Sequence, residues 1–203
     1  TDPENMLEAN HPARVFHNDV KHTFAMHDAI VVGVIASPAN DTATDNAALS
    51  TNKGIYTPKN LQAIDGVTQQ ILNTEGVIAR DVMSFSTVDN ITQGDDGELK
   101  FSWMMSQAPS SQEEADYIAD AITRLPMLQG SLASSSHNAA AIYVPIKDKN
   151  ESFRIAEDIR AYIGANTTNE TLQWHITGLP VAEDQFGVEM FIQMAISAPA
   201  AGL

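Results

Sequence analysis

The sequence contains no cysteine, few basic residues and few aromatic residues. Its 203 residues include 11 Lys and Arg against 26 Asp and Glu, a formal net charge of −15 at pH 7. Without cysteine there can be no disulfide, no thiolate metal ligand and no cysteine nucleophile. A surface this acidic repels phosphate groups, so we exclude nucleic acid as a partner. It also disfavours attachment to an anionic membrane surface through basic residues.

Long hydrophobic runs are missing too. The longest apolar runs, at 30–36 and 139–146, have the length of strands and fall well short of the ~20 residues of a membrane-spanning helix. With 43% hydrophobic residues, the chain can nevertheless build a folded core. The opening segment 1–4 is acidic and resembles no signal peptide. Because it lacks an initiating Met, we expect a piece of a longer chain.

A strand–helix–strand unit is predicted over residues 30–86. The β-branched run at 30–35 predicts a strand that is buried on both faces. After a long loop at 37–57, Pro58 begins a helix that ends at Gly76. Val77–Ser86 is then expected to form the next strand.

The same order recurs over residues 139–178. Residues 139–146 predict a strand, a helix follows from Ser152 to a stop at Gly164, and 172–176 alternate like a half-exposed strand. Two such units predict an α+β fold, a ferredoxin-like split βαβ sandwich. The predicted domain spans residues 30–185.

An insertion at 88–137 separates the two units. Alternation of Leu99, Phe101, Trp103 and Met105 with polar residues predicts a strand, and the preceding residues 94–97 predict a turn. A helix follows, opened by a capping box at Ser110 and Glu113 or, one residue later, at Ser111 and Glu114. Its predicted core positions are Ile118, Ala121, Ile122 and Leu125. Met83, Met104 and Met105 suit either an adaptable apolar groove or core filling.

Metal and cofactor sites are not indicated by the sequence. The N-terminal segment contains His11, His17, His22 and His27, but their spacing spreads them around a helix, and no HExxH motif occurs. Neither glycine-rich phosphate-binding motif is present. We therefore expect no metal and no cofactor.

Catalytic residues are not indicated either. The sequence Ser134-Ser135-Ser136-His137 is interpreted as a polar turn, because catalytic triads join residues that are distant in sequence. The acidic pairs Glu113/Glu114, Glu157/Asp158 and Glu183/Asp184 are adjacent in sequence, so their members do not face each other on a helix. We expect no enzymatic activity.

Several stretches resemble a known family. They are 1–7 (TDPENML), 27–34 (HDAIVVGV) and 175–184 (HITGLPVAED), which continues through 186–187 (FG) to 190–194 (MFIQM). Together they resemble the first large extracytoplasmic loop of resistance–nodulation–division (RND) exporters, in the branch close to the MmpL-like and hydrophobe-exporter proteins. The resemblance covers essentially all 203 residues.

The resemblance implies a porter-type domain, commonly ferredoxin-like, between transmembrane helices 1 and 2. Such exporters move hydrophobic or amphiphilic molecules outward, driven by protons that pass through residues of the membrane helices. The implied location is the periplasmic side of the bacterial inner membrane. The implied partners are the protein's own transmembrane domain, a second extracytoplasmic domain, a hydrophobic or lipid-like substrate and, as an option, further copies of the protein.

In this scheme residues 1–29 leave transmembrane helix 1, and residues 186–203 form a helix that approaches transmembrane helix 2. Gly178, Leu179 and Pro180 are interpreted as a rigid exit from the last strand, and Gly187 as a tight turn toward the membrane. An alternative role for these residues is a hinge.

The resemblance leads to two structural expectations. The two termini should lie close together at one end of the domain, the end that faces the membrane. The apolar residues Phe186, Met190, Phe191 and Met194 should be partly exposed, because their natural neighbours lie outside this sequence. The competing hypothesis is a free-standing extracytoplasmic protein that binds a ligand or metal through its His-rich N-terminal segment.

Overall fold

The computed structural model describes residues 6–37, 53–94, 96–167 and 171–201. Residues 1–5 of the first resembling stretch, most of the expected loop at 37–57, and Asp95 of the expected turn lie outside this part of the chain. The helices and strands are α1 (Pro12–Thr23), β1 (Ala29–Ala36), α2 (Pro58–Leu72), β2 (Asp89–Gln93), β3 (Leu99–Trp103), α3 (Gln112–Arg124), β4 (Ala139–Pro145), α4 (Ser152–Asn166), β5 (Leu172–Thr177) and α5 (Leu179–Ala201).

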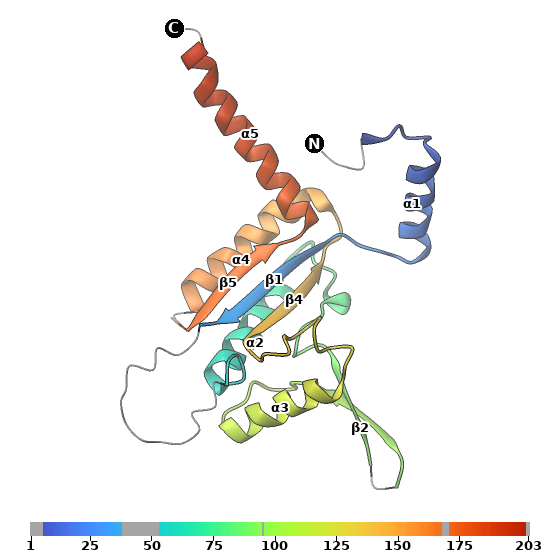
Figure 1. The fold of residues 1–203 in the computed structure, drawn as a ribbon, viewed down its shortest axis with the longest axis vertical. Helices are drawn as coiled ribbons and strands as arrows, with labels where there is room; N and C mark the ends of the chain where they lie inside the picture. The colour runs from blue at the N-terminus through green and yellow to red at the C-terminus, as the bar shows by residue number, and fades with distance from the viewer. Residues whose placement is uncertain (1–5, 38–52, 95, 168–170, 202–203) are drawn as a thin grey trace.

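The architecture is α+β and confirms the predicted split βαβ arrangement. The main sheet has the strand order β4-β1-β5, and both pairs are antiparallel. Val32 in the central strand pairs with Ile142 on one side and with Ile176 on the other. Helices α2 and α4 cover one face of this sheet (Figure 1).

The strand expected at Val77–Ser86 is only partly formed. The segment lies along the outer edge of β4, where Met83 and Tyr143 exchange two backbone hydrogen bonds of 3.0 and 2.9 Å. Between the pairs Ile78–Pro145 and Met83–Tyr143, a 3₁₀ turn at Ala79–Asp81 adds residues that have no partner position on β4. The edge position of a fourth strand is therefore occupied, but the ladder is interrupted.

The prediction that strand β1 is buried on both faces is wrong. Ile30, Val32 and Val34 are fully buried against the helices, whereas Ile35 is 41% exposed on the opposite face. Both helices of a split βαβ fold lie on the same side of the sheet, so alternate residues of every strand face away from them. The continuous β-branched run reflects the strand preference of these residue types rather than burial on two sides.

The two sheet-covering helices form for the predicted local reasons. The Thr57 side chain accepts a hydrogen bond of 3.2 Å from the Asn60 backbone N–H, and Pro58 occupies the first turn of α2. Helix α2 ends at Leu72, before Gly76. Helix α4 continues past Gly164 to Asn166, because one glycine costs a helix only ~1 kcal/mol. The residues of both helices buried in the core are Leu61, Ile64, Val67, Thr68, Ile71, Ile155, Ala156 and Ile159.

The insertion contains one more strand than the sequence predicted. Strand β3 pairs with β2 in an antiparallel hairpin in which Ile91 lies opposite Phe101. The turn between them is closed by a 2.8 Å hydrogen bond from the Gly94 N–H to the Glu98 carbonyl, and Gly97 has a φ of +83°. Helix α3 follows at the base of the hairpin (Figure 1).

The chain enters and leaves the sheet at the same end. Val31 near the start of β1 pairs with Thr177 at the end of β5, so α1 precedes and α5 follows that end (Figure 1). Helix α1 has no buried residue. On α5, Phe186, Met190, Phe191 and Met194 are 42–67% exposed. The expected exposure of these four residues is confirmed. The expected closeness of the two termini concerns residues 1–5 and 202–203, which lie outside the described residues, so it stays a prediction.

Candidate functional site

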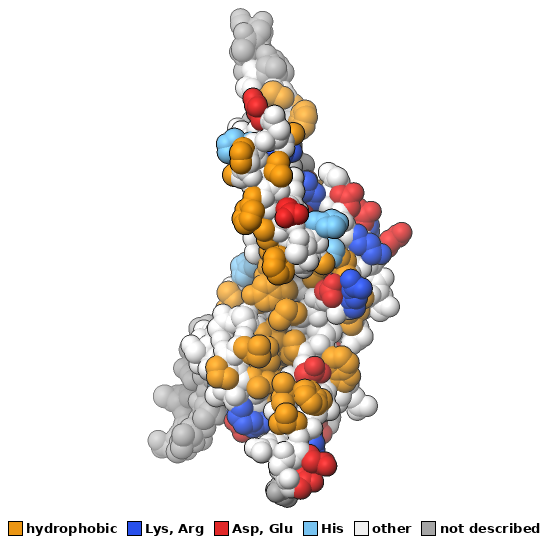
Figure 2. Space-filling model, turned by 90° about the vertical axis from the view of Figure 1, so that its right-hand side faces the viewer, with side chains coloured by type: hydrophobic (Ala, Val, Ile, Leu, Met, Phe, Trp, Pro, Cys, Tyr) orange, Lys and Arg blue, Asp and Glu red, His pale blue; other side chains and the backbone are white. Residues whose placement is uncertain are grey.

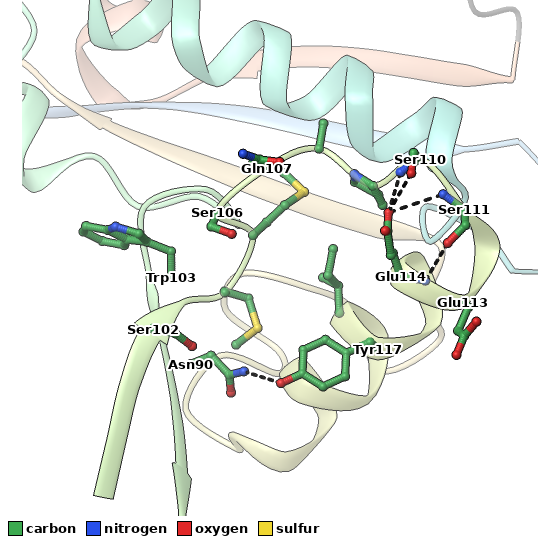
Figure 3. A pocket seen from close by; sticks show the side chains of 15 residues that line it. Asn90, Ser102, Trp103, Ser106, Gln107, Ser110, Ser111, Glu113, Glu114 and Tyr117 are labelled. Carbon is green, nitrogen blue, oxygen red and sulfur yellow. Dashed lines mark hydrogen bonds between the residues drawn. The ribbon is translucent and has the colours of Figure 1, made fainter.

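A groove lies between the base of the β2–β3 hairpin and the N-terminal half of α3 (Figure 3). Its volume is about 800 Å³. Apolar and polar side chains both contribute to it. The lining residues are Asn90, Ser102, Trp103, Met104, Met105, Ser106, Gln107, Ala108, Pro109, Ser110, Ser111, Glu113, Glu114, Tyr117 and Ile118.

The two methionines that follow strand β3 form the buried side of the groove. Met104 and Met105 are 3% and 2% exposed. Their backbone N–H groups donate to the carbonyls of Val88 and Phe85 at 2.8 and 3.0 Å, which ties the end of the hairpin to the core. Both roles proposed for these methionines therefore apply, since they fill the core and also line a groove. Met83, in contrast, is 42% exposed and lies outside the groove.

Helix α3 begins at one wall of the groove with the second of the two possible capping boxes. The Ser111 hydroxyl accepts from the Glu114 backbone N–H at 3.3 Å, and the Glu114 carboxylate accepts from the Ser111 N–H at 3.4 Å. The same carboxylate accepts from the Ser110 N–H at 2.7 Å. These hydrogen bonds, the Ser110 backbone contribution first, lower the pKa of Glu114. The lowered pKa means that the carboxylate stays ionised to lower pH than an unperturbed glutamate.

The position of α3 is fixed by polar contacts with the segment that precedes α2. The Lys53 ammonium donates to both oxygens of Asp116, at 2.6 and 2.7 Å, and this contact is the main cause of the lowered pKa of Asp116. The Gln112 side-chain amide donates to the Tyr56 carbonyl at 2.8 Å. On the other side, the Gln62 amide donates to the Pro109 carbonyl at 2.8 Å. The wall of the groove is thus anchored to the main domain.

Asn90 of strand β2 is the most deeply buried polar residue of the groove. It is 2% exposed, and its Nδ2 donates to the Tyr117 hydroxyl at 3.3 Å. Its Oδ1 is buried and has no hydrogen-bond partner in the described part of the chain. Figure 3 shows the Asn90–Tyr117 contact across the groove, from the hairpin to α3.

One face of the hairpin carries an exposed apolar patch. Ile91, Leu99, Phe101 and Trp103 are 41–65% exposed. The register places Ile91 and Phe101 directly opposite each other, and residues two apart in β3 share that face. Figure 2 shows hydrophobic side chains gathered over the lower part of this side of the molecule, with charged side chains mainly at its margins. Trp103 belongs both to this patch and to the groove.

The residues interpreted as a strand exit lie at the junction of β5 and α5. Gly178 has a φ of +133°, and a Cβ at this position would lie 2.5 Å from the Ala29 carbonyl oxygen. Its own carbonyl accepts the Ala182 N–H at 3.0 Å, the first hydrogen bond of the helix. Leu179 and Pro180 form the first turn of α5, with Leu179 exposed and Pro180 buried.

The tight turn predicted at Gly187 is wrong. Helix α5 begins at Leu179, not near residue 186, and continues through Gly187 to Ala201. Nothing lies within 4 Å of the position that a Gly187 Cβ would occupy. A single glycine between good helix formers costs too little to end the helix.

The N-terminal histidines are not brought together into a metal site. His11 caps α1, where its Nδ1 accepts the Ala13 N–H at 3.2 Å. Among the residues that the structure describes, no group of three or more His, Asp or Glu side chains could hold a metal ion. His137 packs edge-on against Tyr56, with ring centroids 5.2 Å apart, and His175 pairs with Gly33 in the sheet.

The acidic pairs and the serine-rich segment have structural partners. Glu157 contacts Arg160, Asp158 contacts Arg154 and Asp184 contacts Ser152. Ser134 to Asn138 form a hydrogen-bonded turn, in which the Ser134 hydroxyl accepts the Asn138 and Ala139 N–H groups at 3.2 and 3.0 Å. The interpretation of residues 134–137 as a polar turn is confirmed.

Sequence reasoning found part of this groove and missed the rest. The capping box and the hairpin strand β3 were predicted from local spacing. Asn90 and Tyr117 were not predicted as groove residues, because their contact depends on how the hairpin packs against α3. The alternation in β3 predicted a strand but gave no sign of the buried amide on β2.

None of the helices described here is long and apolar enough to cross a membrane. No protein-family model, no curated protein and no solved structure matches the chain.

Proposed function

We propose that this chain is an extracytoplasmic domain of a proton-driven RND-type exporter of hydrophobic or amphiphilic molecules. In this role it guides or gates the substrate and catalyses no reaction. Its place is the periplasmic side of the bacterial inner membrane, next to the transmembrane domain and a second extracytoplasmic domain of the same protein.

The observation that carries this proposal is the common end at which the chain enters and leaves the sheet. A domain inserted between two membrane helices must have both connections at the membrane surface. The Val31–Thr177 pair brings the start of β1 beside the end of β5. A Cβ on Gly178 would collide with Ala29, which shows how closely the two connections approach.

The surface of α5 supports the same orientation. Phe186, Phe191, Ile192 and Ile196 are 48–68% exposed, and at 100° per residue they lie all around the helix. A helix that is apolar on every side is typical of surroundings that are themselves apolar, either other protein elements or lipid. We therefore assign the distal part of α5 to a contact with the membrane domain.

The groove supports the non-catalytic part of the proposal. It combines Met104, Met105 and Ile118 on its buried side with serines and carboxylates at its rim. Methionine side chains adapt to ligands of different shape. Such a surface suits the passage of amphiphilic molecules, which carry an apolar body and a polar head.

Fractionation of cells that produce the parent protein tests the proposal. An antibody against this chain should detect it in the inner-membrane fraction, retained after washes with high salt and carbonate and released by detergent. Peripheral attachment alone would not survive those washes. Recovery of the intact protein in a soluble fraction would contradict the exporter proposal.

A further inference from the structure

Helix α1 lies outside the core of the domain. None of its twelve residues is buried. Four large apolar side chains in and beside it, those of Met6, Phe16, Phe24 and Met26, are 55–82% exposed. Figure 1 shows α1 beside the end of the sheet from which α5 projects. Packing within the described part of the chain therefore does not account for the apolar residues of this segment.

The apolar residues of α1 share one face of the helix. At 100° per residue, four of them fall within a sector of about 80°. They are Ala13, Phe16, Val20 and the C-cap residue Phe24. Arg14 and Lys21 lie outside this face, and their long side chains can extend toward polar head groups. A helix of this pattern with no place in a protein core is typical of the interface between a membrane and water.

The charge of this segment differs from that of the rest of the chain. The net charge of −15 opposes contact with an anionic surface, but almost all of it lies outside residues 6–28. The segment contains three carboxylates, two bases and four of the six histidines. The charged residues that surround the histidines are Glu8, Arg14, Asp19, Lys21 and Asp28, of which Lys21 and Asp28 form an ion pair of 3.5 Å. Histidine is the side chain that commonly gains a charge between about pH 8 and pH 5. Acidification therefore makes this segment net positive.

We propose that α1 lies on the surface of a phospholipid bilayer, with its apolar face among the acyl chains and its histidines near anionic head groups. Its place there rests on the proposed function, in which residues 1–5 follow a membrane helix, because the eleven residues before α1 span at most ~40 Å. At physiological salt, charges more than ~8 Å from the lipid are largely screened, so the acidic main domain does not cancel the local attraction. The lipid binding itself requires only the chain described here.

Fluorophores on two sides of α1 test which side meets the lipid. The chain has no cysteine, so Ala13→Cys, on the apolar face, and Asn18→Cys, outside it, can each carry one nitrobenzoxadiazole group. Both positions are exposed in the described chain. The vesicles are phosphatidylcholine with about one third phosphatidylglycerol, at about pH 5.5. The fluorescence at position 13 should rise at least about twofold, because the fluorophore leaves water, and that at position 18 should change little.

The pH dependence of binding tests the role of the histidines. Each positive charge near an anionic surface adds about fivefold to the affinity, so a change from about pH 7.5 to 5.5 should strengthen binding at least about fivefold. Vesicles of phosphatidylcholine alone should show less than about a twofold change. The triple variant His17→Gln, His22→Gln and His27→Gln should reduce the rise on anionic vesicles to less than about twofold. His11 is retained because its Nδ1 caps the helix. The matched control is His175→Gln, at an exposed position of β5, and it should keep the full rise.

Removal of the aromatic residues tests the apolar face. Phe16→Ser with Phe24→Ser should weaken vesicle binding at least about tenfold, because two large side chains no longer enter the lipid. Both residues are 71% exposed, so the domain should stay folded, which circular dichroism checks. The matched control is Phe186→Ser with Phe191→Ser on α5, where the residues are 60% and 67% exposed. It should leave the fluorescence change at position 13 and the pH dependence intact.

Four results would overturn the assignment. They are equal or absent fluorescence changes at positions 13 and 18, a full pH-dependent rise in the triple histidine variant, an equal loss of that rise in His175→Gln, and unchanged binding after removal of Phe16 and Phe24. The outcome is distinct from that of the membrane fractionation. An integral exporter could hold α1 against its own membrane domain and fail these vesicle tests, and a soluble parent protein could pass them.

Discussion

Replacement of Gly178 by alanine should destabilise the domain by roughly 2–4 kcal/mol, from backbone strain together with steric overlap. The φ of +133° is unfavourable for any residue with a Cβ. The new Cβ would also lie 2.5 Å from the Ala29 carbonyl oxygen and 3.2 Å from the Ile30 Cα, both backbone atoms of the central strand. Neither can move without disturbing β1. The measurement is urea unfolding followed by circular dichroism.

Gly187→Ala is the matched control, because both glycines were predicted to shape the exit from the domain. Gly187 lies inside α5 with nothing within 4 Å of the new Cβ. Alanine should therefore raise the free energy of unfolding by up to ~1 kcal/mol or leave it unchanged. Equal destabilisation by the two substitutions would contradict the described junction between β5 and α5.

Ile30→Ala should lower the free energy of unfolding by about 2–5 kcal/mol. Ile30 is fully buried in β1, between the sheet and the helices that cover it. Removal of its outer carbons loses their burial and leaves a cavity that the surrounding core can only partly fill. Urea unfolding at several denaturant concentrations measures the change.

Ile35→Ala removes the same atoms from the same strand at a position that is 41% exposed. It should cost at most about 1.5 kcal/mol, since less apolar surface is returned to water. A cost equal to that of Ile30→Ala would mean that the second face of the sheet is covered as fully as the first, as the sequence had predicted.

The helices whose starts were predicted correctly are indicated by residues that are close together in the sequence. Thr57 and Pro58 indicate the start of α2, and the capping box of Ser111 and Glu114 indicates the start of α3. Each signal depends only on residues within one helical turn. The order of strands and helices was then sufficient to predict the split βαβ fold, because few topologies connect two such units.

The features that were missed depend on contacts between distant segments. The residues of β2, Asp89–Gln93, are mostly polar, and they form a strand because β3 pairs with them. The burial of Asn90 follows from the packing of that hairpin against α3, which no local pattern encodes. The open face of the main sheet was missed for a related reason, since β-branched residues occupy both faces of β1.

The central claim, that this domain faces the periplasm from the inner membrane, is tested most directly by cysteine labelling of the parent protein in whole cells. The chain has no cysteine of its own, so Ser135→Cys introduces one thiol at an exposed position and Ser84→Cys introduces one at a fully buried position. The unsubstituted protein measures any background from thiols elsewhere in the parent. The reagent is a small charged maleimide that cannot cross the inner membrane.

The account predicts that Ser135→Cys is labelled in intact cells to the same extent as after lysis, and that Ser84→Cys is labelled only after unfolding. Labelling of Ser135→Cys that requires lysis would place the domain in the cytoplasm and contradict the exporter proposal.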